Sequence, residues 1–182
     1  PLTNEILVSD AGDSSFSGEE STIAMNAQGD FVIVWDGENG SDSNGVFGQR
    51  FNADGSKIGS IFHADTSTSG TQLNPTVAIN DAGNFVIAWQ ETNKIQFQSF
   101  DDQGDRIGNV EQIVISGFLT HEDPAVSINQ SGDFAISLTY GLSSDKGIRA
   151  QVFDSAGTAQ TSVLTVNAGG SDGNQINSDI LL

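Results

Sequence analysis

Hydrophobic and polar positions repeat along the chain in three copies of one pattern. A polar turn leads into an apolar, β-branched run in each copy: "GDFVIVW" (29–35), "GNFVIAW" (83–89) and "GDFAISL" (132–138). The near-continuous apolar run predicts a strand buried on both faces. The segment before each run alternates apolar with small or polar residues, as at Ile23 and Met25, which is the period of a half-buried strand.

Two further blocks follow each apolar run in a fixed order. The first begins at Val46 ("VFGQRFNADGSKIG"), Ile95 ("IQFQSFDDQGDRIG") and Ile148 ("IRAQVFDSAGTAQT"). The second is a short β-rich piece at 60–65, 110–116 and 162–167. The segments between the predicted strands contain Asn or Asp with Gly three residues later, as in "NAQG" and "DDQG". These residue types are typical of tight turns. Each unit is therefore predicted to form four strands joined by hairpin turns.

Four-stranded units of about 50 residues are typical of β-propeller blades. We therefore predict an all-β fold of propeller-like blades, with a linear β-solenoid or stacked sandwiches as alternatives. The expected organisation is the fourth strand of a preceding unit, three complete repeats, and the first strand of a following unit. These pieces are residues 1–20, 21–74, 75–123, 124–177 and 178–182. Three units are fewer than the roughly 4 to 8 blades of closed propellers, so further repeats or other chains are expected to complete the molecule.

The charge balance narrows the range of partners. Twenty-four acidic residues face six basic ones, giving a net charge of −18. A negative field of this size disfavours nucleic acids and anionic membrane surfaces and favours cations. No cysteine is present, which excludes disulfides and thiolate chemistry. No apolar run approaches the ~18 residues of a membrane span, so no membrane insertion is expected.

The repeated motif resembles a repeat of very large extracellular bacterial proteins that also carry calcium-binding and adhesin-like modules. The most recognisable piece is "GVFGQRFNADG" (45–55), and the likeness covers nearly the whole chain. The third unit departs from it, because Leu138 replaces the tryptophan and "GTAQT" replaces the "GxxIG" ending. The resemblance implies a secreted or cell-surface location and a structural or adhesive role. It supplies no catalytic residue.

Calcium is the first candidate ligand. The segment "DGENGSDSNG" (36–45) is expected to be a loop whose carboxylate, amide and backbone oxygens suit Ca²⁺. Its candidate ligands are Asp36, Glu38, Asp42 and Asn44. The alternative is a solvated insertion. A second acidic series recurs at the later hairpin turn, where turn chemistry alone explains it: Asn52, Asp54, Asp101, Asp102 and Asp154.

Aromatic and amide side chains recur once per unit. Trp35 and Trp89 end buried-looking strands, so we interpret them as core residues rather than as sugar platforms of a lectin. A glutamine inside each third strand needs a hydrogen-bond partner. These glutamines are expected to bond backbone between blades or to line one exposed face: Gln49, Gln98 and Gln151.

Catalytic signals are weak in the sequence. Neither histidine, His63 or His121, recurs, and "HED" (121–123) is interpreted as an ordinary polar turn. Three arginines and a single tyrosine resemble parts of the anion clamp of sialidase propellers, but they fall at different places in their units: Arg50, Arg106, Arg149 and Tyr140. The sequence therefore predicts that the protein is not an enzyme.

The function predicted from the sequence is a structural or adhesive repeat module of an extracellular bacterial protein. It is expected to be stabilised by Ca²⁺ and to self-assemble head to tail, because unpaired strands at the two ends are complementary edges. The alternative is a lectin-like module that binds cell-surface glycans through its loops. A hydrolase of the sialidase type is the third interpretation.

Overall fold

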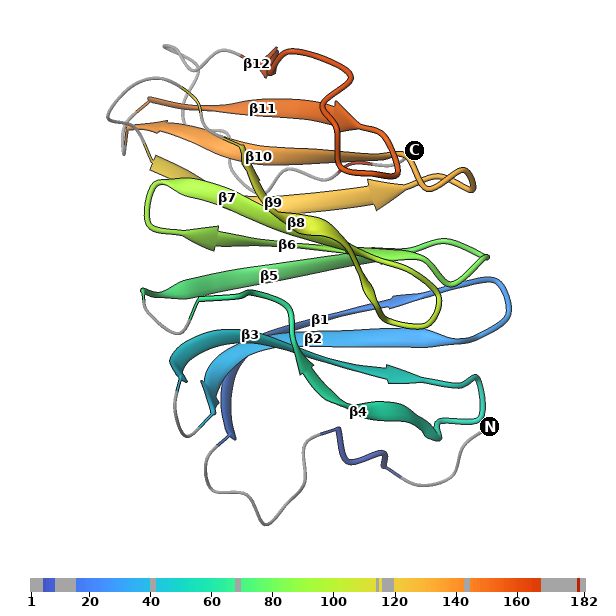
Figure 1. Cartoon of the computed structure of the whole chain (residues 1–182). Helices are drawn as coiled ribbons and strands as arrows, with labels where there is room; N and C mark the ends of the chain where they lie inside the picture. Colours follow the sequence, from blue (N-terminus) through green and yellow to red (C-terminus); the bar gives the residue numbers. More distant parts are fainter. Residues whose placement is uncertain are drawn as a thin grey trace.

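A computed structural model of the chain describes residues 5–8, 16–39, 42–67, 70–113, 115, 120–142, 145–167 and 180. These residues form β-strands and no helix, and so contain no helix that could span a membrane. The strands are β1 (Phe16–Met25), β2 (Phe31–Asn39), β3 (Asp42–Phe51), β4 (Lys57–His63), β5 (Gln72–Ile79), β6 (Phe85–Glu91), β7 (Lys94–Phe100), β8 (Arg106–Ile113), β9 (Thr120–Ile128), β10 (Phe134–Leu142), β11 (Asp145–Phe153) and β12 (Leu164–Asn167) (Figure 1).

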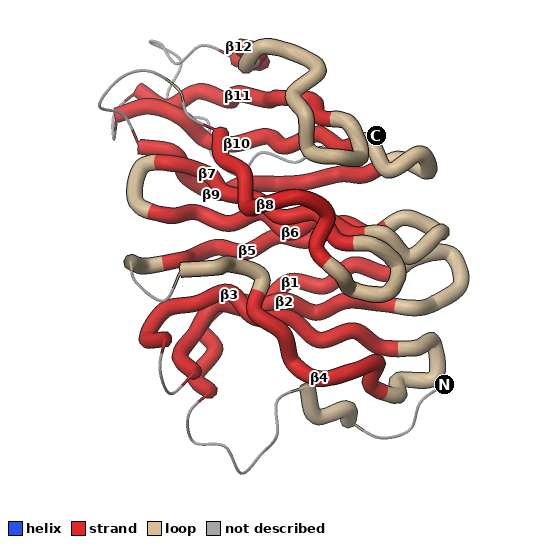
Figure 2. Tube along the Cα trace, in the orientation of Figure 1, coloured by secondary structure: helices blue, strands red, loops and turns tan. Residues whose placement is uncertain are grey.

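The strands form three antiparallel sheets of four strands each. We call them blade 1 (β1–β4), blade 2 (β5–β8) and blade 3 (β9–β12); in each, the strands are paired in chain order. Figure 2 shows that the described residues are strands and connecting loops, with the blades stacked one on the next. The first strand of each blade is its nearest strand to the neighbouring blade, since β5 lies against both β1 and β9. The predicted all-β, propeller-like fold is confirmed.

The hairpin turns are closed by the recurring Asn and Asp side chains. Asn26 Oδ1 accepts hydrogen bonds from the backbone N–H groups of Gln28 (3.1 Å) and Asp30 (2.9 Å). In the later turn of blade 2, Asp101 Oδ1 accepts from the N–H groups of Gln103 and Asp105 in the same way. The acidic residues of these turns therefore serve the turn itself.

The hydrophobic cores lie between the blades. Val32 and Val34 of blade 1 pack with Phe85, Ile87 and Trp89 of blade 2. A second core joins the other face of blade 2 to blade 3 and includes Phe97, Phe134, Ile136 and Phe153. Trp89 is fully buried and Trp35 is 6% exposed, which confirms that the tryptophans belong to the core. Each blade thus gains most of its apolar burial from its neighbour.

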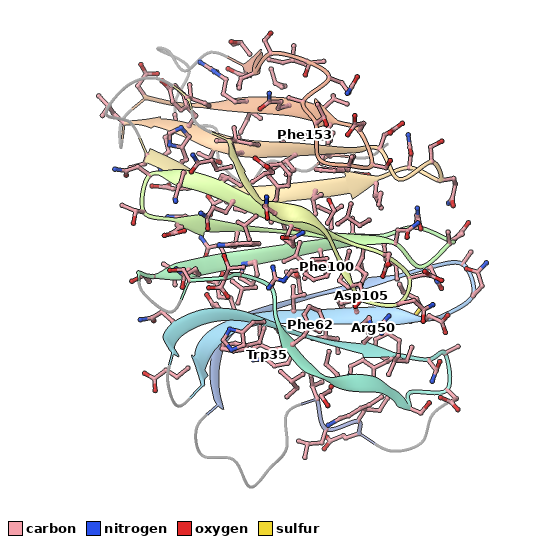
Figure 3. All side chains as sticks on the ribbon, in the orientation of Figure 1. Trp35, Arg50, Phe62, Phe100, Asp105 and Phe153 are labelled. Atoms are coloured by element: carbon pink, nitrogen blue, oxygen red, sulfur yellow. The ribbon has the colours of Figure 1, made fainter. Side chains whose placement is uncertain are left out.

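One aromatic ring is supplied by different strands in blades 1 and 2. In blade 1 the ring comes from Phe62 on β4, and it contacts Phe85 (6.0 Å) and Phe100 (5.4 Å) of blade 2 (Figure 3). The residue beside it on β3 is Gly48, whose absent Cβ would lie 2.5 Å from the Phe62 ring. In blade 2 the ring comes from the third strand.

That ring is Phe97 on β7, paired with Glu111 on β8. It contacts Phe134 (5.4 Å) and Phe153 (4.6 Å) of blade 3, the counterparts of the two rings that Phe62 contacts. The same relative position is therefore filled by one ring in both blades. In blade 1 the ring comes from the fourth strand, where Phe62 pairs with Gly48. In blade 2 it comes from the third strand, where Phe97 pairs with Glu111.

The recurring glutamines satisfy backbone inside their own blade. Gln98 is 1% exposed, and its Nε2 donates to the carbonyl oxygens of Ser99 (2.8 Å) and Ile107 (2.9 Å). Gln49 makes the same pair of bonds in blade 1, whereas Gln151 donates to Thr161 O alone (2.9 Å). Both alternatives expected from the sequence, inter-blade bonding and an exposed row, are wrong. The amides instead supply donors where the third and fourth strands lose their regular register.

The end pieces are described only in part. Residues 5–8 form no strand, and residues 16–20, which were expected to belong to a preceding unit, are part of β1. Of the predicted first strand at 178–182, only Ile180 lies within the described residues. Strand-mediated assembly through these ends stays outside what the structure describes.

Candidate active site

Each blade begins with a β-bulge in its first strand. The register shifts between Gly18 and Ser21 in β1, between Leu73 and Thr76 in β5, and opposite Ser137 to Thr139 in β9. The bulges bring Glu20, Asn74 and Asp123 to equivalent positions. Asn74 and Asp123 adopt positive φ values of 53° and 49°, a backbone conformation that Asn and Asp tolerate better than most residues. We call this edge of the blades the bulge end.

A buried aspartate joins the first two bulges. Asp36 on β2 is 2% exposed. Its Oδ1 accepts the backbone N–H of Glu20 (2.8 Å), and its Oδ2 accepts the N–H of Asn74 (3.3 Å) in the next blade. Two backbone donors that the bulges remove from the ladder are thereby satisfied by one carboxylate.

Asn74 continues the connection to blade 3. Its side-chain Nδ2 donates to Gln90 Oε1 (3.2 Å) and to Asp123 Oδ1 (3.4 Å). The hydrogen bonds therefore run from β1 through Asp36 and Asn74 to β9, crossing all three first strands at one end. This end of the three blades is held as a single polar network.

Two adjacent carboxyl groups in that network have opposite pKa shifts. Glu122 forms an ion pair with Lys146 of β11, and hydrogen bonding to the ammonium group lowers the pKa of Glu122. Burial raises the pKa of the half-buried Asp123, and the neighbouring charge of Glu122 raises it further. Neighbouring acids whose environments separate their pKa values are typical of acid–base sites.

An aromatic and cationic wall flanks the carboxyl pair in blade 3. His121 is 1% exposed and meets the Tyr140 ring edge to face, at 5.3 Å between centroids. Arg149 also contacts the Tyr140 ring, with its Cζ 4.9 Å from the ring centroid. Arg149 also donates to the carbonyl oxygen of Asn167 (2.9 Å), which fixes its guanidinium.

The segment "HED" is therefore not the ordinary turn that the sequence suggested. His121, Glu122 and Asp123 lie on β9. The carboxyl group of Asp123 belongs to the bulge-end network, and that of Glu122 pairs with Lys146. Alignment of the units contained a signal for this position, since polar Glu20, Asn74 and Asp123 all precede the residue that opens the repeat. What alignment could not supply is the bulge, which brings the side chains of Asn74 and Asp123 within hydrogen-bonding distance.

The three arginines do not form a shared anion clamp. Arg50 donates to the carbonyl oxygens of Asp102 and Gln103 in blade 2. Arg106 donates to the carbonyl oxygens of His63, Ala64 and Asp65 in the opposite direction. Arg50 and Arg106 bind backbone across the junction of blades 1 and 2, and Arg149 remains within blade 3.

The predicted calcium ligands are only partly placed by the structure. The expected loop is largely a hairpin, because β2 continues to Asn39 and β3 begins at Asp42. Glu38 is exposed and Asn44 is half-buried, while the side chain of Asp42 lies outside the described residues. Both carboxylate oxygens of Asp36 already accept backbone N–H groups at the bulge end. Calcium binding here stays a prediction.

The blade arrangement defines the chain as a β-propeller-like protein. No family model matches it, and no curated protein matches it by sequence. Solved structures share the fold, among them the following three.

The endo-arabinase of Bacteroides thetaiotaomicron VPI-5482 has a TM-score of 0.55 at 14% identity, covering 85% of this chain and 65% of that one. The alpha-L-arabinanase of Penicillium chrysogenum, complexed with arabinobiose, has a TM-score of 0.56 at 14% identity, covering 84% and 49%. A GH43 beta-1,3-galactosidase has a TM-score of 0.52 at 13% identity, covering 85% and 33%. The chain thus spans less than two thirds of each of these proteins.

These likenesses correct the functional interpretation. The predictions of a structural or adhesive module, of a lectin-like module and of a protein that is not an enzyme are contradicted by these likenesses, because the three solved structures named above are carbohydrate-cleaving enzymes by name. The sequence argument failed because it took repetition as a sign of a passive scaffold. A propeller uses the same repetition to gather the starts of its first strands at one end.

Proposed function

We propose that the chain is part of a carbohydrate-active β-propeller that cleaves glycosidic bonds at its bulge end. The observation that carries this proposal is the half-buried carboxyl group of Asp123, whose pKa is raised by burial and by the charge of Glu122, and whose position in blade 3 is that of the exposed carboxylate Glu20 in blade 1. Glycoside hydrolysis requires one carboxyl group that keeps its proton and one that stays ionised. The shared fold with an arabinanase and a galactosidase supports carbohydrate as the substrate class.

Asp123 takes the role of proton donor. Burial keeps its carboxyl group protonated to a higher pH than an exposed aspartate, so it can protonate the glycosidic oxygen as the bond to the anomeric carbon breaks. The hydrogen bond from Asn74 Nδ2 fixes the orientation of the carboxyl group. Glu122 is held ionised by Lys146, and its charge contributes to the raised pKa of Asp123.

Glu20 supplies the second carboxylate. It occupies the position in blade 1 that Asp123 occupies in blade 3, and it is exposed. Asp36 is less suited to this role because both its oxygens hold backbone N–H groups. In this assignment Glu20 removes a proton from the water that attacks the anomeric carbon, and Asp123 gives its proton to the departing oxygen.

Release of reducing sugar tests this assignment. The substrates are arabinan, β-1,3-galactan and a panel of chromogenic glycosides, and the variants are Asp123→Asn and Glu20→Gln. Loss of a general acid or base lowers the rate by about 10²- to 10⁴-fold. Asp105→Asn is the matched control, because Asp105 is an exposed carboxylate at the opposite, turn end of blade 2 (Figure 3).

Two results would contradict the proposal. Hydrolysis that survives Asp123→Asn at the wild-type rate would remove Asp123 from the chemistry. A complete absence of hydrolysis over the whole panel, with folded protein shown by circular dichroism, would remove the activity. Retained activity in the Asp105→Asn control is required for the comparison with Asp123→Asn.

A further inference from the structure

An arginine closes the junction between blades 1 and 2 at the turn end. Arg50 reaches from β3 across the junction, where its Nη1 and Nη2 donate to the carbonyl oxygens of Asp102 (2.8 Å) and Gln103 (2.5 Å). The guanidinium lies directly on Gly104, since a Cβ added there would be 2.8 Å from Arg50 Cζ. The junction thus contains a guanidinium site that the chain fills with its own side chain.

The next junction repeats this geometry without the arginine. The strand register places Ser99 of β7 where Arg50 lies on β3, because Val32 pairs with Arg50 and its counterpart Val86 pairs with Ser99. The turn of blade 3 places Ser155 and Ala156 where Asp102 and Gln103 lie. At Gly157, the counterpart of Gly104, an added Cβ would meet only a Phe97 ring atom, at 3.7 Å.

A cavity of about 300 Å³ occupies the vacant position. Ser99, Ser155 and Ala156 line it, together with the ring of Phe100 and the side chain of Ile107. The difference in which strand supplies the aromatic ring does not create this space. Phe97 fills at this junction the position that Phe62 fills at the other one. The cavity follows from the change of arginine to serine.

One residue that lines the cavity, Ser99, also carries a buried polar group. Ser99 is 5% exposed, and its Oγ has no hydrogen-bond partner among the described residues. A buried hydroxyl without a partner is uncommon in folded proteins, so this junction is less completely satisfied than the first one. The net charge of −18 attracts cations to the surface on which the cavity opens.

We propose that this cavity binds a guanidinium group carried on an alkyl stem. The ligand repeats the contacts of Arg50: its N–H groups donate to the carbonyl oxygens of Ser155 and Ala156, and its stem lies against Phe100 and Ile107. A planar guanidinium has donors in the fork that two adjacent carbonyl oxygens accept, whereas an ammonium group has not. The volume lies at the lower end of the range for small-ligand sites, which suits an arginine side chain.

Backbone amide chemical shifts measured by NMR test the proposal. The probe is Nα-acetyl-arginine amide, and its control is Nα-acetyl-citrulline amide, which has the same shape without the charge. We expect saturable shifts at Ser99, Ser155 and Ala156, with the citrulline compound binding at least about tenfold more weakly. Methylguanidine identifies the source: equal affinity assigns the site to small guanidinium compounds, and weaker affinity assigns it to an arginine side chain of a partner.

Two variants exchange the residues that occupy the equivalent positions of the two junctions. Ser99→Arg places the chain's own guanidinium in the cavity, so the probe-induced shifts should disappear while the melting temperature is maintained or raised. Arg50→Ser opens the first junction and should add a second set of shifts at Asp102 and Gln103. Shifts that persist at Ser155 in Ser99→Arg, or equal binding of the citrulline compound, would overturn the proposal.

Discussion

Gln98 offers a stability test for the recurring glutamines. Its replacement by methionine keeps a similar length and volume but removes every polar atom from a side chain that is 1% exposed. The carbonyl oxygens of Ser99 and Ile107 would lose their donor, and Arg106 Nη1 would lose the acceptor Oε1 at 3.2 Å. Methionine can replace none of these three bonds.

The expected cost follows from those three bonds. A buried neutral hydrogen bond contributes about 1 kcal/mol and one to a charged group about 1.5–3 kcal/mol, so Gln98→Met should destabilise the fold by roughly 3–5 kcal/mol. Gln151 is the internal control, because it occupies the same position in blade 3 and donates one bond, to Thr161 O. Gln151→Met should therefore cost about 1 kcal/mol.

Urea unfolding followed by tryptophan fluorescence gives both values. The midpoint should fall in each variant while the slope of the free energy of unfolding against urea stays at the wild-type value, because the surface exposed on unfolding is unchanged. A cost below about 1 kcal/mol for Gln98→Met would refute the reasoning. So would an equal cost for the two variants.

The remaining predictions concern charge and backbone. Asp123 has a raised folded pKa, so its contribution to stability is complete below its unfolded pKa and is lost as the pH rises through the folded value. The melting temperature of Asp123→Asn should therefore rise relative to that of the wild type as the pH rises through the folded pKa of Asp123, and the difference should persist above it. Glu122 has a lowered pKa, so Glu122→Gln should lose stability at neutral pH and match the wild type in acid; the same sign for both variants would contradict the assignment. Arg106→Ala removes three carbonyl contacts between blades 1 and 2 and should cost about 2–4 kcal/mol in urea unfolding. Gly108→Ala forces a Cβ onto a φ of 70° and should cost about 1–2 kcal/mol, even though no atom within 3.8 Å crowds it; an unchanged midpoint would exclude this strain.

The sequence predicted the features that depend on neighbours along the chain. The alternation around Ile23, the turn sequence after Asn26 and the buried run ending at Trp89 each follow from local period or turn chemistry, and each is present in the structure. These patterns also give the number of strands in each unit. They are sufficient for the fold class.

The features that depend on contacts between blades could not be predicted. "HED" reads as a turn because Pro124 follows it, and only the bulge in β9 brings Asp123 within hydrogen-bonding distance of Asn74. Asp36 was expected to be a loop ligand, and its burial depends on two N–H groups more than fifteen residues away. Contacts of this kind depend on how the sheets lie relative to one another. The hydrophobic pattern along the chain contains no information on that arrangement.

The exchange of one aromatic ring between strands limits how such repeats can recombine. A crossover between the third and fourth strands would pair Gly48 with Glu111, leaving no ring, or Phe97 with Phe62, giving two rings for one space. An added Cβ at position 48 would already lie 2.5 Å from the Phe62 ring, so the second hybrid cannot be accommodated without rearrangement. Gene duplication and unequal crossing-over can therefore propagate this repeat only as whole third-and-fourth-strand pairs. The unit of inheritance is the hairpin rather than the single strand.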